Sequence, residues 1–515
     1  MQMLSSCFDK ITTYILQCCG VVVAGFIAKY SFICYHNPLL LLLSFEIFIL
    51  LLQHDFTELS CTKTSFLSFL FFASIYTSNC YHAYYFAQYL INSKIIILLC
   101  IVMAFSFFST FYFLACFIAK KITHDKISFL ILFSTLITVS EIVINSYICT
   151  FSPFTLAQGL LNLYYCSQII SFCGQYGFTF LFLIFLSCIN TRKYYKIGIG
   201  IAIILTTFGM VKTYYNTNDN AKNAKNINVN LIQTNINKDY NDYNFEELCR
   251  YISPTTKKIN LNNDDMNFIF TPEGCYLSDN IDNVKTIANM FKHKNVYFGF
   301  WSLQRIKNKH YSTYHIFNDN TIVKTCYKKH PFFLFEYIPQ WLVYFFNVVD
   351  NLFSYNISEE YSSQLSPYYG ENIVAVNENL KFNVDICLDS IVKNNYIISK
   401  CDFMVCVASL RFCQGEDVVE QYINNCRVRA IEYGVPMVLI CNCGKSCIIS
   451  PHGEIIGFTD TNTKQVLSYK LTFSSHGMTF FQKYRYLLLW IIIVFILLFF
   501  VITYFYRKKK YNYTV

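Results

Sequence analysis

The chain has 515 residues, of which 54% are hydrophobic and only 14% are charged, and its formal net charge is +9. Ordinary soluble domains are about a quarter charged, so this composition excludes a single soluble domain and indicates a membrane protein. Much of the positive charge lies in short loops beside apolar segments. The sequence therefore does not favour a nucleic-acid partner.

Apolar runs dominate residues 1–215, and a further apolar run covers residues 486–506. A helix needs about 20 apolar residues to cross a bilayer. We therefore expect about eight transmembrane helices, seven before the polar part of the chain and one after it. The expected spans are 11–28, 38–53, 65–86, 95–118, 127–149, 166–189, 197–214 and 486–506, of which the second is short.

The basic residues outside the apolar runs predict the orientation of these spans. They gather in the loops "AKKITHDK" and "NTRKYYK" and in the tail 507–515, which begins "RKKK". Loops rich in Lys and Arg stay in the cytoplasm, so these three segments are expected there. Residues 216–485 then lie on the outer face. In a bacterium with two membranes, the chain would sit in the inner membrane with this domain in the periplasm.

One carboxylate interrupts the fifth expected span. Glu141 lies in the run "SEIVINSYI", and a carboxylate facing lipid is costly. We expect it to point into the helix bundle toward a polar partner, in a structural role.

The polar part of the chain alternates strand and helix patterns in residues 216–485. "NAKNINVN" is read as a linker, and "DVVEQYINNCRVRAIEYG" is read as a helix that ends at Gly434. "STYHIFNDNTIVKTCYKK" reads as a hairpin with its turn at "NDN", and "SCIISPHGEIIGF" reads as a second hairpin. Further strands are predicted at "VNLIQTNI", "MNFIFTPEG", "NVYFGFW", "FNVDIC", "FMVCVAS" and "VPMVLIC". The pattern is typical of a layered α/β domain.

Three ionisable side chains fall at or just past the ends of predicted strands: Glu273, Lys328 and Cys387. Functional groups in such sheets gather at one edge. A thiol becomes a strong nucleophile when a general base removes its proton, and Glu273 could do so. Lys328 could favour the thiolate and stabilise an oxyanion. Spacing alone does not show that the three side chains meet.

These residues resemble, in this order, the Glu–Lys–Cys triad of the nitrilase superfamily, in "FTPEG", "YKKHPFFLFEYIP" and "DICLDS". With seven spans before the domain and one after it, the chain looks like an apolipoprotein N-acyltransferase. "LIQTNI", "RVRAIEYGVP" and "ISPHGEIIG" are similar to further motifs of that family. In the membrane part, "SEIVINSYICTFSPF" and "QIISFCGQYGFTFL" resemble its Glu-containing span and its Gly-x-Tyr-Gly span.

The resemblance implies a fold, a domain plan and a reaction. It implies an α-helical membrane domain of many spans at 1–215, an α-β-β-α sandwich of the nitrilase type at 216–485, a membrane anchor at 486–506 and a basic tail at 507–515. The reaction transfers an acyl chain from a membrane phospholipid, through a thioester, to the N-terminal amine of a diacylglyceryl apolipoprotein. No metal or dissociable cofactor is implied, and we expect a monomer in the lipid bilayer.

The resemblance also assigns roles to five residues. Glu273 is the base, Lys328 the oxyanion stabiliser and Cys387 the acylated nucleophile. Glu336 matches a second essential glutamate that would position Lys328 or share the proton transfers. Asp389 stands where the family has a glutamate.

Two departures from the family pattern remove no member of the triad. Arg411 replaces a tryptophan and Phe335 replaces a glycine. We expect these changes to alter the preference for acyl chain or lipoprotein. Lys329 follows Lys328 directly. Only the alignment with the family motif identifies Lys328, and not Lys329, as the expected catalytic lysine.

Two further features have competing interpretations. Residues 339–355 are either a buried helix or an arm at the membrane face, with four aromatic candidates for lipid contact: Trp341, Tyr344, Phe345 and Phe346. Cys441, Cys443 and Cys447 form a C-x-C-x3-C pattern that fits no common zinc motif, so we expect no metal there.

Two other functions remain open on the sequence alone. A membrane-tethered amidase or nitrilase-like hydrolase could use the same triad with water as the acceptor. A degenerate, non-catalytic membrane scaffold is the second alternative, favoured mildly by "ASLRFC" and opposed by the intact triad.

Overall fold

The computed structural model describes most of the chain, in two compact units. The described residues are 2–33, 37–53, 59–77, 94–123, 125–148, 155–236, 249, 252, 259, 265–274, 281–292, 295–307, 309–332, 336, 344, 365–368, 370–392, 400–411, 415–474, 477–485, 487, 491, 494–495, 498–499 and 501–502. Unit 1 comprises Met1–Tyr214 and Thr479–Val515, and unit 2 comprises Tyr215–Met478. The first boundary falls within a single helix, α10.

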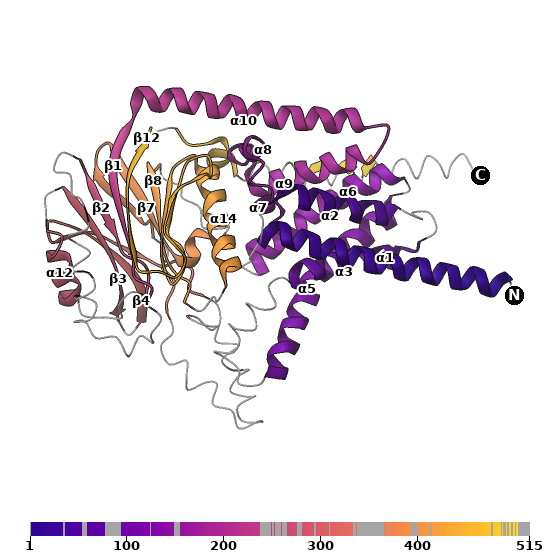
Figure 1. The fold of residues 1–515 in the computed structure, drawn as a ribbon, viewed down its shortest axis with the longest axis horizontal. Coiled ribbons are helices and arrows are strands. Elements are labelled where there is room, and N and C mark those ends of the chain that lie inside the picture. Colours follow the sequence, from indigo (N-terminus) through magenta and orange to yellow (C-terminus); the bar gives the residue numbers. More distant parts are fainter. Residues whose placement is uncertain are drawn as a thin grey trace. The chain divides into compact units, whose positions relative to one another are not determined.

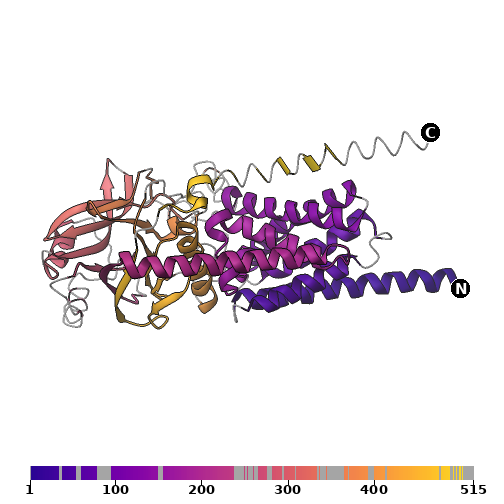
Figure 2. The same cartoon turned by 90° about the horizontal axis from the view of Figure 1, so that it is seen from above.

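Unit 1 is helical (Figure 1). Its helices are α1 (Gln2–Ile33), α2 (Pro38–Gln53), α3 (Cys61–Tyr76), α5 (Lys94–Ile122), α6 (Lys126–Val143), the π-helix η2 (Ile144–Ile148), α7 (Leu156–Gly159), α8 (Tyr164–Ser167), α9 (Ile170–Ile189) and α10 (Tyr195–Asn223). Helix α1 packs on α2 and α3, α3 on α5, α5 on α6, and α6 on α9. Figure 2 shows the same bundle from above.

Five of the described helices contain a segment long and apolar enough to cross a membrane. These segments are Lys10–Ser31, Ile101–Ile122, Lys126–Ser146, Ile170–Ile189 and Tyr195–Asn216. The second expected span coincides with α2, whereas the third, 65–86, overlaps α3 only over residues 65–76 and continues outside the described residues; α2 and α3 have 16 residues each. The last expected span, 486–506, lies largely outside the described residues. The structure therefore supports several apolar helices before unit 2 and does not establish a total of eight.

Large apolar side chains cover the outside of this helical unit. Leu16, Met103 and Ile204 are 65%, 68% and 66% exposed. A water-soluble bundle would bury such side chains, because contiguous exposed apolar surface drives association. The exposed apolar surface is what contact with lipid requires.

Polar contacts inside unit 1 fix where its helices begin and bend. Asp125 caps α6 by accepting a hydrogen bond from the Ser128 amide at 2.9 Å. Glu141 points into the bundle, as the sequence predicts, with 4% of its surface exposed. Its Oε1 accepts a hydrogen bond from the Leu156 amide at 2.9 Å, at the start of α7. Gly174 bends α9 with a φ of +71°, and a Cβ there would lie 2.4 Å from the Phe481 ring.

Unit 2 contains two six-stranded sheets, seen side-on in Figure 1. The first has the order β12-β1-β2-β3-β4-β5 and the second β11-β10-β9-β8-β7-β6. The strands of the first sheet are β1 (Lys225–Gln233), β2 (Asn267–Phe270), β3 (Val296–Ile306), β4 (Lys309–Asn318), β5 (Thr321–Tyr327) and β12 (Gln465–Phe473). Those of the second are β6 (Ile373–Asn377), β7 (Leu380–Ile386), β8 (Phe403–Ser409), β9 (Met437–Asn442), β10 (Cys447–Ile449) and β11 (Ile455–Phe458).

The polar linker expected at "NAKNINVN" is wrong. Helix α10 continues to Asn223, and β1 begins at Lys225. Its polar appearance has a physical cause, because β1 pairs with β12 on one side and its first residues, Lys225 and Asn226, remain partly or fully exposed. Strands β6 and β12, which pattern reading did not single out, are the outermost strands of their sheets.

The two sheets face each other through a continuous apolar core. Alternate residues of each strand point into it, as the two-residue period of a strand requires. On β2, Phe268 and Phe270 face the second sheet, where Phe382 and Phe403 lie 5.4 to 5.6 Å from the Phe268 ring. Ile269 faces the other way and packs under α12 (Ile281–Asn289).

A second helix covers the outer face of the second sheet. Helix α14 (Glu416–Tyr433) packs on β9 and β10 and ends at Gly434, whose φ of +65° fits a left-handed cap. Helices α12 and α14 therefore lie on the outer faces of the two sheets, giving layers in the order helix, sheet, sheet, helix (Figure 1). This is the predicted sandwich.

A buried histidine lies within the first sheet, on β4. The Nε2 atom of His315 is 2.8 Å from Ser302 Oγ and 3.2 Å from Thr313 Oγ1. Its Nδ1 atom is 3.0 Å from Thr325 Oγ1. Burial lowers the pKa of His315 to about 4, because the charged imidazolium loses its hydration there.

We predict that this histidine makes unit 2 sensitive to acid. The unfolded chain binds a proton near pH 6.5, whereas the folded chain resists it until about pH 4. Stability is therefore lost as the pH falls through that window, by up to about 3 kcal/mol from this group. Unfolding of the detergent-solubilised protein at several pH values measures this loss. His315→Gln, which cannot titrate, is expected to flatten the pH dependence; an unchanged dependence would contradict the assignment.

Candidate active site

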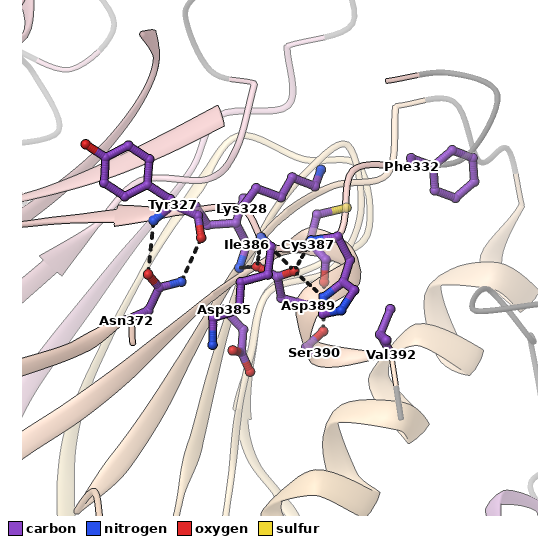
Figure 3. A network of polar contacts seen from close by, with 12 residues as sticks. Tyr327, Lys328, Phe332, Asn372, Asp385, Ile386, Cys387, Asp389, Ser390 and Val392 are labelled. Atoms are coloured by element: carbon purple, nitrogen blue, oxygen red, sulfur yellow. Dashed lines mark hydrogen bonds and ion pairs between the residues drawn. The ribbon is translucent and has the colours of Figure 1, made fainter. Parts of the chain in front are cut away.

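Cys387 occupies a sharp turn at the end of β7. It is the first residue of a short 3-10 helix, Cys387–Ser390, and its φ is +49°. A non-glycine residue pays a steric penalty in this left-handed region, so such a conformation persists only where its surroundings enforce it. The thiol is partly buried, and Figure 3 shows it reaching into the same space as the Lys328 side chain.

Lys328 follows directly after β5 and is 1% exposed. Its Nζ atom lies 2.8 Å from Glu273 Oε1 and 2.8 Å from Glu336 Oε1. Glu273 comes from the loop after β2 and is 4% exposed. The cation therefore bridges two carboxylates from distant parts of the chain.

Glu336 is itself held by the loop that follows Lys328. Its Oε2 accepts a hydrogen bond from the Phe332 amide at 2.7 Å, and its own amide donates to the Phe332 carbonyl at 2.8 Å. One oxygen of Glu336 thus binds Lys328 while the other closes the loop. This geometry suits a residue that positions the lysine.

The electrostatics of the site favour a neutral thiol at rest. Burial is the largest influence on Cys387 and, with the charge of Glu273, raises the pKa of the thiol well above its ordinary value; Lys328 offsets only part of this. The Glu273 carboxylate lies close enough to the Cys387 thiol for each group to shift the pKa of the other. The candidate nucleophile and its candidate base are therefore neighbours in the site.

The charges of the two other groups follow from the same surroundings. Burial raises the pKa of Glu273; Lys328 opposes this increase and Glu336 adds to it. Burial alone would lower the pKa of Lys328, but the electrostatic interactions with Cys387, Glu273 and Glu336 together outweigh burial and raise it well above its ordinary value. Lys328 is thus a permanent cation, and Glu273 is a stronger base than an exposed glutamate.

Asp389 lies below the turn, 1% exposed, and ties the lysine loop to it (Figure 3). Its carboxylate accepts hydrogen bonds from the Lys329 amide at 3.1 Å and from the His330 amide at 2.8 Å. The His330 ring lies 3.0 Å away through Nδ1. Asp389 therefore couples the position of Lys328 to that of Cys387 without pointing at either reactive atom.

Two further residues that sequence reasoning did not assign also join these strands. The side chain of Asn372 accepts from the Tyr327 amide at 3.0 Å and donates to the Tyr327 carbonyl at 2.8 Å, while its backbone carbonyl accepts from the Val384 amide (Figure 3). On α14, Arg429 donates to the carbonyls of Ser390 and Val392 just past the turn. Arg429 lies within "RVRAIEYGVP", a motif recognised in the sequence, but the sequence did not indicate that it holds these carbonyls.

Most of the residues expected to contact lipid fall outside the part of the chain that the structure describes. Tyr344 is 73% exposed, and Trp341, Phe345 and Phe346 lie outside the described residues, as does Phe335. Cys441, Cys443 and Cys447 are buried on or beside β9 and β10. Within the described part of the chain, no three His, Cys, Asp or Glu side chains gather as metal ligands would.

Asp389→Ala is predicted to destabilise unit 2 and disorganise the site. The change leaves the buried amides of residues 329 and 330 without an acceptor, at a cost of about 1–3 kcal/mol for each such group. Thermal unfolding of the purified protein measures the loss. Asp282→Ala is the matched control, because Asp282 forms an exposed ion pair on α12 and should change stability by less than about 1 kcal/mol. Equal shifts for the two variants would contradict the proposed coupling.

Two family models match the chain. The apolipoprotein N-acyltransferase N-terminal domain matches residues 24–188, and the carbon-nitrogen hydrolase domain matches residues 269–479. The second match contains Glu273, Lys328, Glu336 and Cys387. No curated protein matches the chain.

Two solved structures are among those that resemble part of the chain. A CN-hydrolase superfamily protein from Xanthomonas campestris, with an arsenic adduct in its active site, is 12% identical with a TM-score of 0.35, over 48% of this chain and 91% of that one. A glutamine-dependent NAD+ synthetase from Acinetobacter baumannii, in complex with ADP, is 13% identical with a TM-score of 0.35, over 50% of this chain and 48% of that one. On the family matches to residues 24–188 and 269–479, the chain belongs to the apolipoprotein N-acyltransferases of the nitrilase superfamily.

Proposed function

We propose that the chain transfers an acyl group from a membrane phospholipid to the N-terminal amine of a diacylglyceryl apolipoprotein, by way of a thioester on Cys387. The observation that carries this proposal is the contact of Glu273, Lys328 and Cys387 in one buried site. The matched N-terminal domain supports a membrane-bound acyltransferase over a soluble member of the superfamily.

The first half of the reaction forms the thioester. Glu273 accepts the thiol proton as the sulfur attacks the ester carbonyl of the phospholipid, and the carbonyl oxygen becomes an oxyanion. The ammonium of Lys328 stabilises that charge in a site with little water. When the intermediate collapses, the C–O bond breaks, and the departing lysophospholipid oxygen takes the proton from Glu273.

The second half transfers the acyl group to nitrogen. The neutral amine of the apolipoprotein attacks the thioester carbonyl, and Glu273 accepts a proton from the nitrogen. The C–S bond then breaks, the amide leaves, and the sulfur regains its proton from Glu273. Each half-reaction returns the base to its starting state, so the scheme is ping-pong and consumes no cofactor.

The resting charges suit this sequence of steps. A thiol with a raised pKa stays protonated until an ester is bound, so the nucleophile forms only as it attacks. Lys328 forms ion pairs with both Glu273 and Glu336. When Glu273 takes up a proton and loses its charge, the ion pair with Glu336 still holds the lysine in place.

The substrates place this chemistry at a membrane surface. Acyl chains leave a bilayer only at high cost, so we propose that eight spans, including 486–506, hold unit 2 at the outer leaflet of the bacterial inner membrane. The basic loops and the basic tail would then lie in the cytoplasm. A monomer suffices for this arrangement.

Cys387→Ala is predicted to abolish acyl-enzyme formation while the protein still inserts into membranes. Incubation with a phospholipid labelled in its acyl chains, followed by mass spectrometry of the protein, measures the trapped acyl group. Cys443→Ala, which removes another thiol from the same domain, should retain it. A labelled acyl group still trapped on the Cys387→Ala variant would contradict the role given to Cys387.

Lys328→Ala and Lys329→Ala are predicted to differ sharply. Loss of the oxyanion-stabilising cation should lower the rate of thioester formation by about 10²–10³-fold or more. Lys329 contacts Asp389 through its backbone amide, which the substitution retains, so its rate should stay within about threefold. Single-turnover acylation kinetics provide the comparison. Equal losses would mean that Lys328 has no special role.

One measurement separates the proposed transferase from the hydrolase and the scaffold. Mass spectrometry of lipoprotein N-termini, in cells with and without this chain, should reveal an amide-linked third acyl chain that depends on Cys387. A hydrolase would release free acid without modifying the lipoprotein, and a scaffold would leave both pools unchanged.

A further inference from the structure

Two hydroxyl groups hold the backbone carbonyl of Cys387 from behind the turn. The Tyr422 hydroxyl, from α14, donates to this carbonyl at 2.7 Å, and the Ser390 hydroxyl donates to it at 2.9 Å. The two hydroxyl oxygens are 3.2 Å apart. Tyr422 is 3% exposed and Ser390 is fully buried.

Packing alone does not account for the tyrosine. Helix α14 covers the second sheet with apolar side chains, and a phenylalanine would fill the same volume without burying a hydroxyl. Burial raises the pKa of Tyr422 well above its ordinary value, so its hydroxyl keeps the proton that it donates. The hydroxyl is therefore a permanent donor to the Cys387 carbonyl.

The contact fixes one peptide group. The carbonyl of Cys387 and the amide N–H of Leu388 belong to the same planar trans peptide, so they point in opposite directions. With the carbonyl held toward α14, the Leu388 N–H must point away from that helix. Helix α14 lies on the outer face of the second sheet, whereas Lys328 comes from the first sheet. The N–H is thus directed to the side from which Lys328 enters.

We propose that Tyr422 is a positioning residue that, with Ser390, orients the Cys387–Leu388 peptide so that its N–H supports the oxyanion beside Lys328. The strained φ of Cys387 makes such support necessary, because an unrestrained peptide would relax away from this orientation. The inference rests on the proposed function, since it concerns the oxyanion of that reaction.

Two reactions of Cys387 distinguish positioning from general structural support. Acylation passes through an oxyanion, whereas alkylation by iodoacetamide displaces iodide and forms none. Tyr422→Phe should therefore slow single-turnover acylation from phospholipid by about 10–100-fold, with an unchanged KM. Alkylation of the Cys387 peptide, followed by mass spectrometry, should stay within about twofold.

Two other variants guard against misfolding and non-specific effects. Ser390→Ala removes the second donor with a smaller change of shape, and it should also slow acylation selectively. Tyr433→Phe removes a hydroxyl from the end of the same helix, and it should leave both reactions unchanged. Acylation unaffected by Tyr422→Phe and Ser390→Ala, or parallel losses in acylation and alkylation, would overturn the positioning role.

An activated ester separates this inference from the proposed function. p-Nitrophenyl butyrate also acylates a thiol through an oxyanion, without any lipid. If the wild-type protein reacts with this ester but not with phospholipid, the proposed function fails while the ester still tests Tyr422. If neither phospholipid nor p-nitrophenyl butyrate acylates the wild-type protein while iodoacetamide still alkylates Cys387, the proposed function and the positioning role of Tyr422 are both overturned.

Discussion

The burial of the Lys328 ammonium is the constraint on which the site depends. A cation with 1% of its surface exposed is tolerable only if opposite charges replace its lost hydration. Glu273 and Glu336 supply them, each at 2.8 Å. Glu273 follows β2, whereas Lys328 and Glu336 lie in the loop after β5, so the ion pairs form only when these strands of the first sheet have reached their final positions. Burial and the nearby carboxylates raise the pKa of the neighbouring thiol, and the same carboxylates keep the lysine charged, so folding and the chemistry of the site are coupled.

Around this centre, polar side chains hold backbone groups instead of touching the reacting atoms. Asp389 fixes the amides after Lys328, Asn372 fixes the end of β5 beside β7, and Arg429 fixes the carbonyls after the turn. Each joins two elements whose relative shift would separate Lys328 from Cys387. The strained conformation of Cys387 is thus supported from both sides, which is the usual condition for a non-glycine residue to keep a positive φ.

The two parts of the chain meet different physical demands. Unit 1 exposes large apolar side chains, and its buried Glu141 accepts a hydrogen bond from the Leu156 amide inside the bundle. Unit 2 buries its apolar residues between two sheets and concentrates its charges at strand ends. The proposed reaction would need both properties, because its lipid substrates would stay in the bilayer while its ester chemistry would need an ordered, water-poor polar site.

The sequence by itself determined the membrane character and most strands of the sandwich, and it singled out Glu273, Lys328 and Cys387 as candidate site residues. These follow from local signals: apolar runs of sufficient length, two-residue alternation, and motifs at fixed spacing. It misjudged "NAKNINVN", because the asparagines that alternate with apolar residues at the start of the inner strand β1 resemble a polar linker. Only the tertiary structure decided that Glu273, Lys328 and Cys387 meet, and that Asn372, Arg429 and Tyr422 hold the backbone around them. Those contacts join residues at least 35 positions apart in the sequence. No local pattern encodes which distant backbone group a side chain will reach.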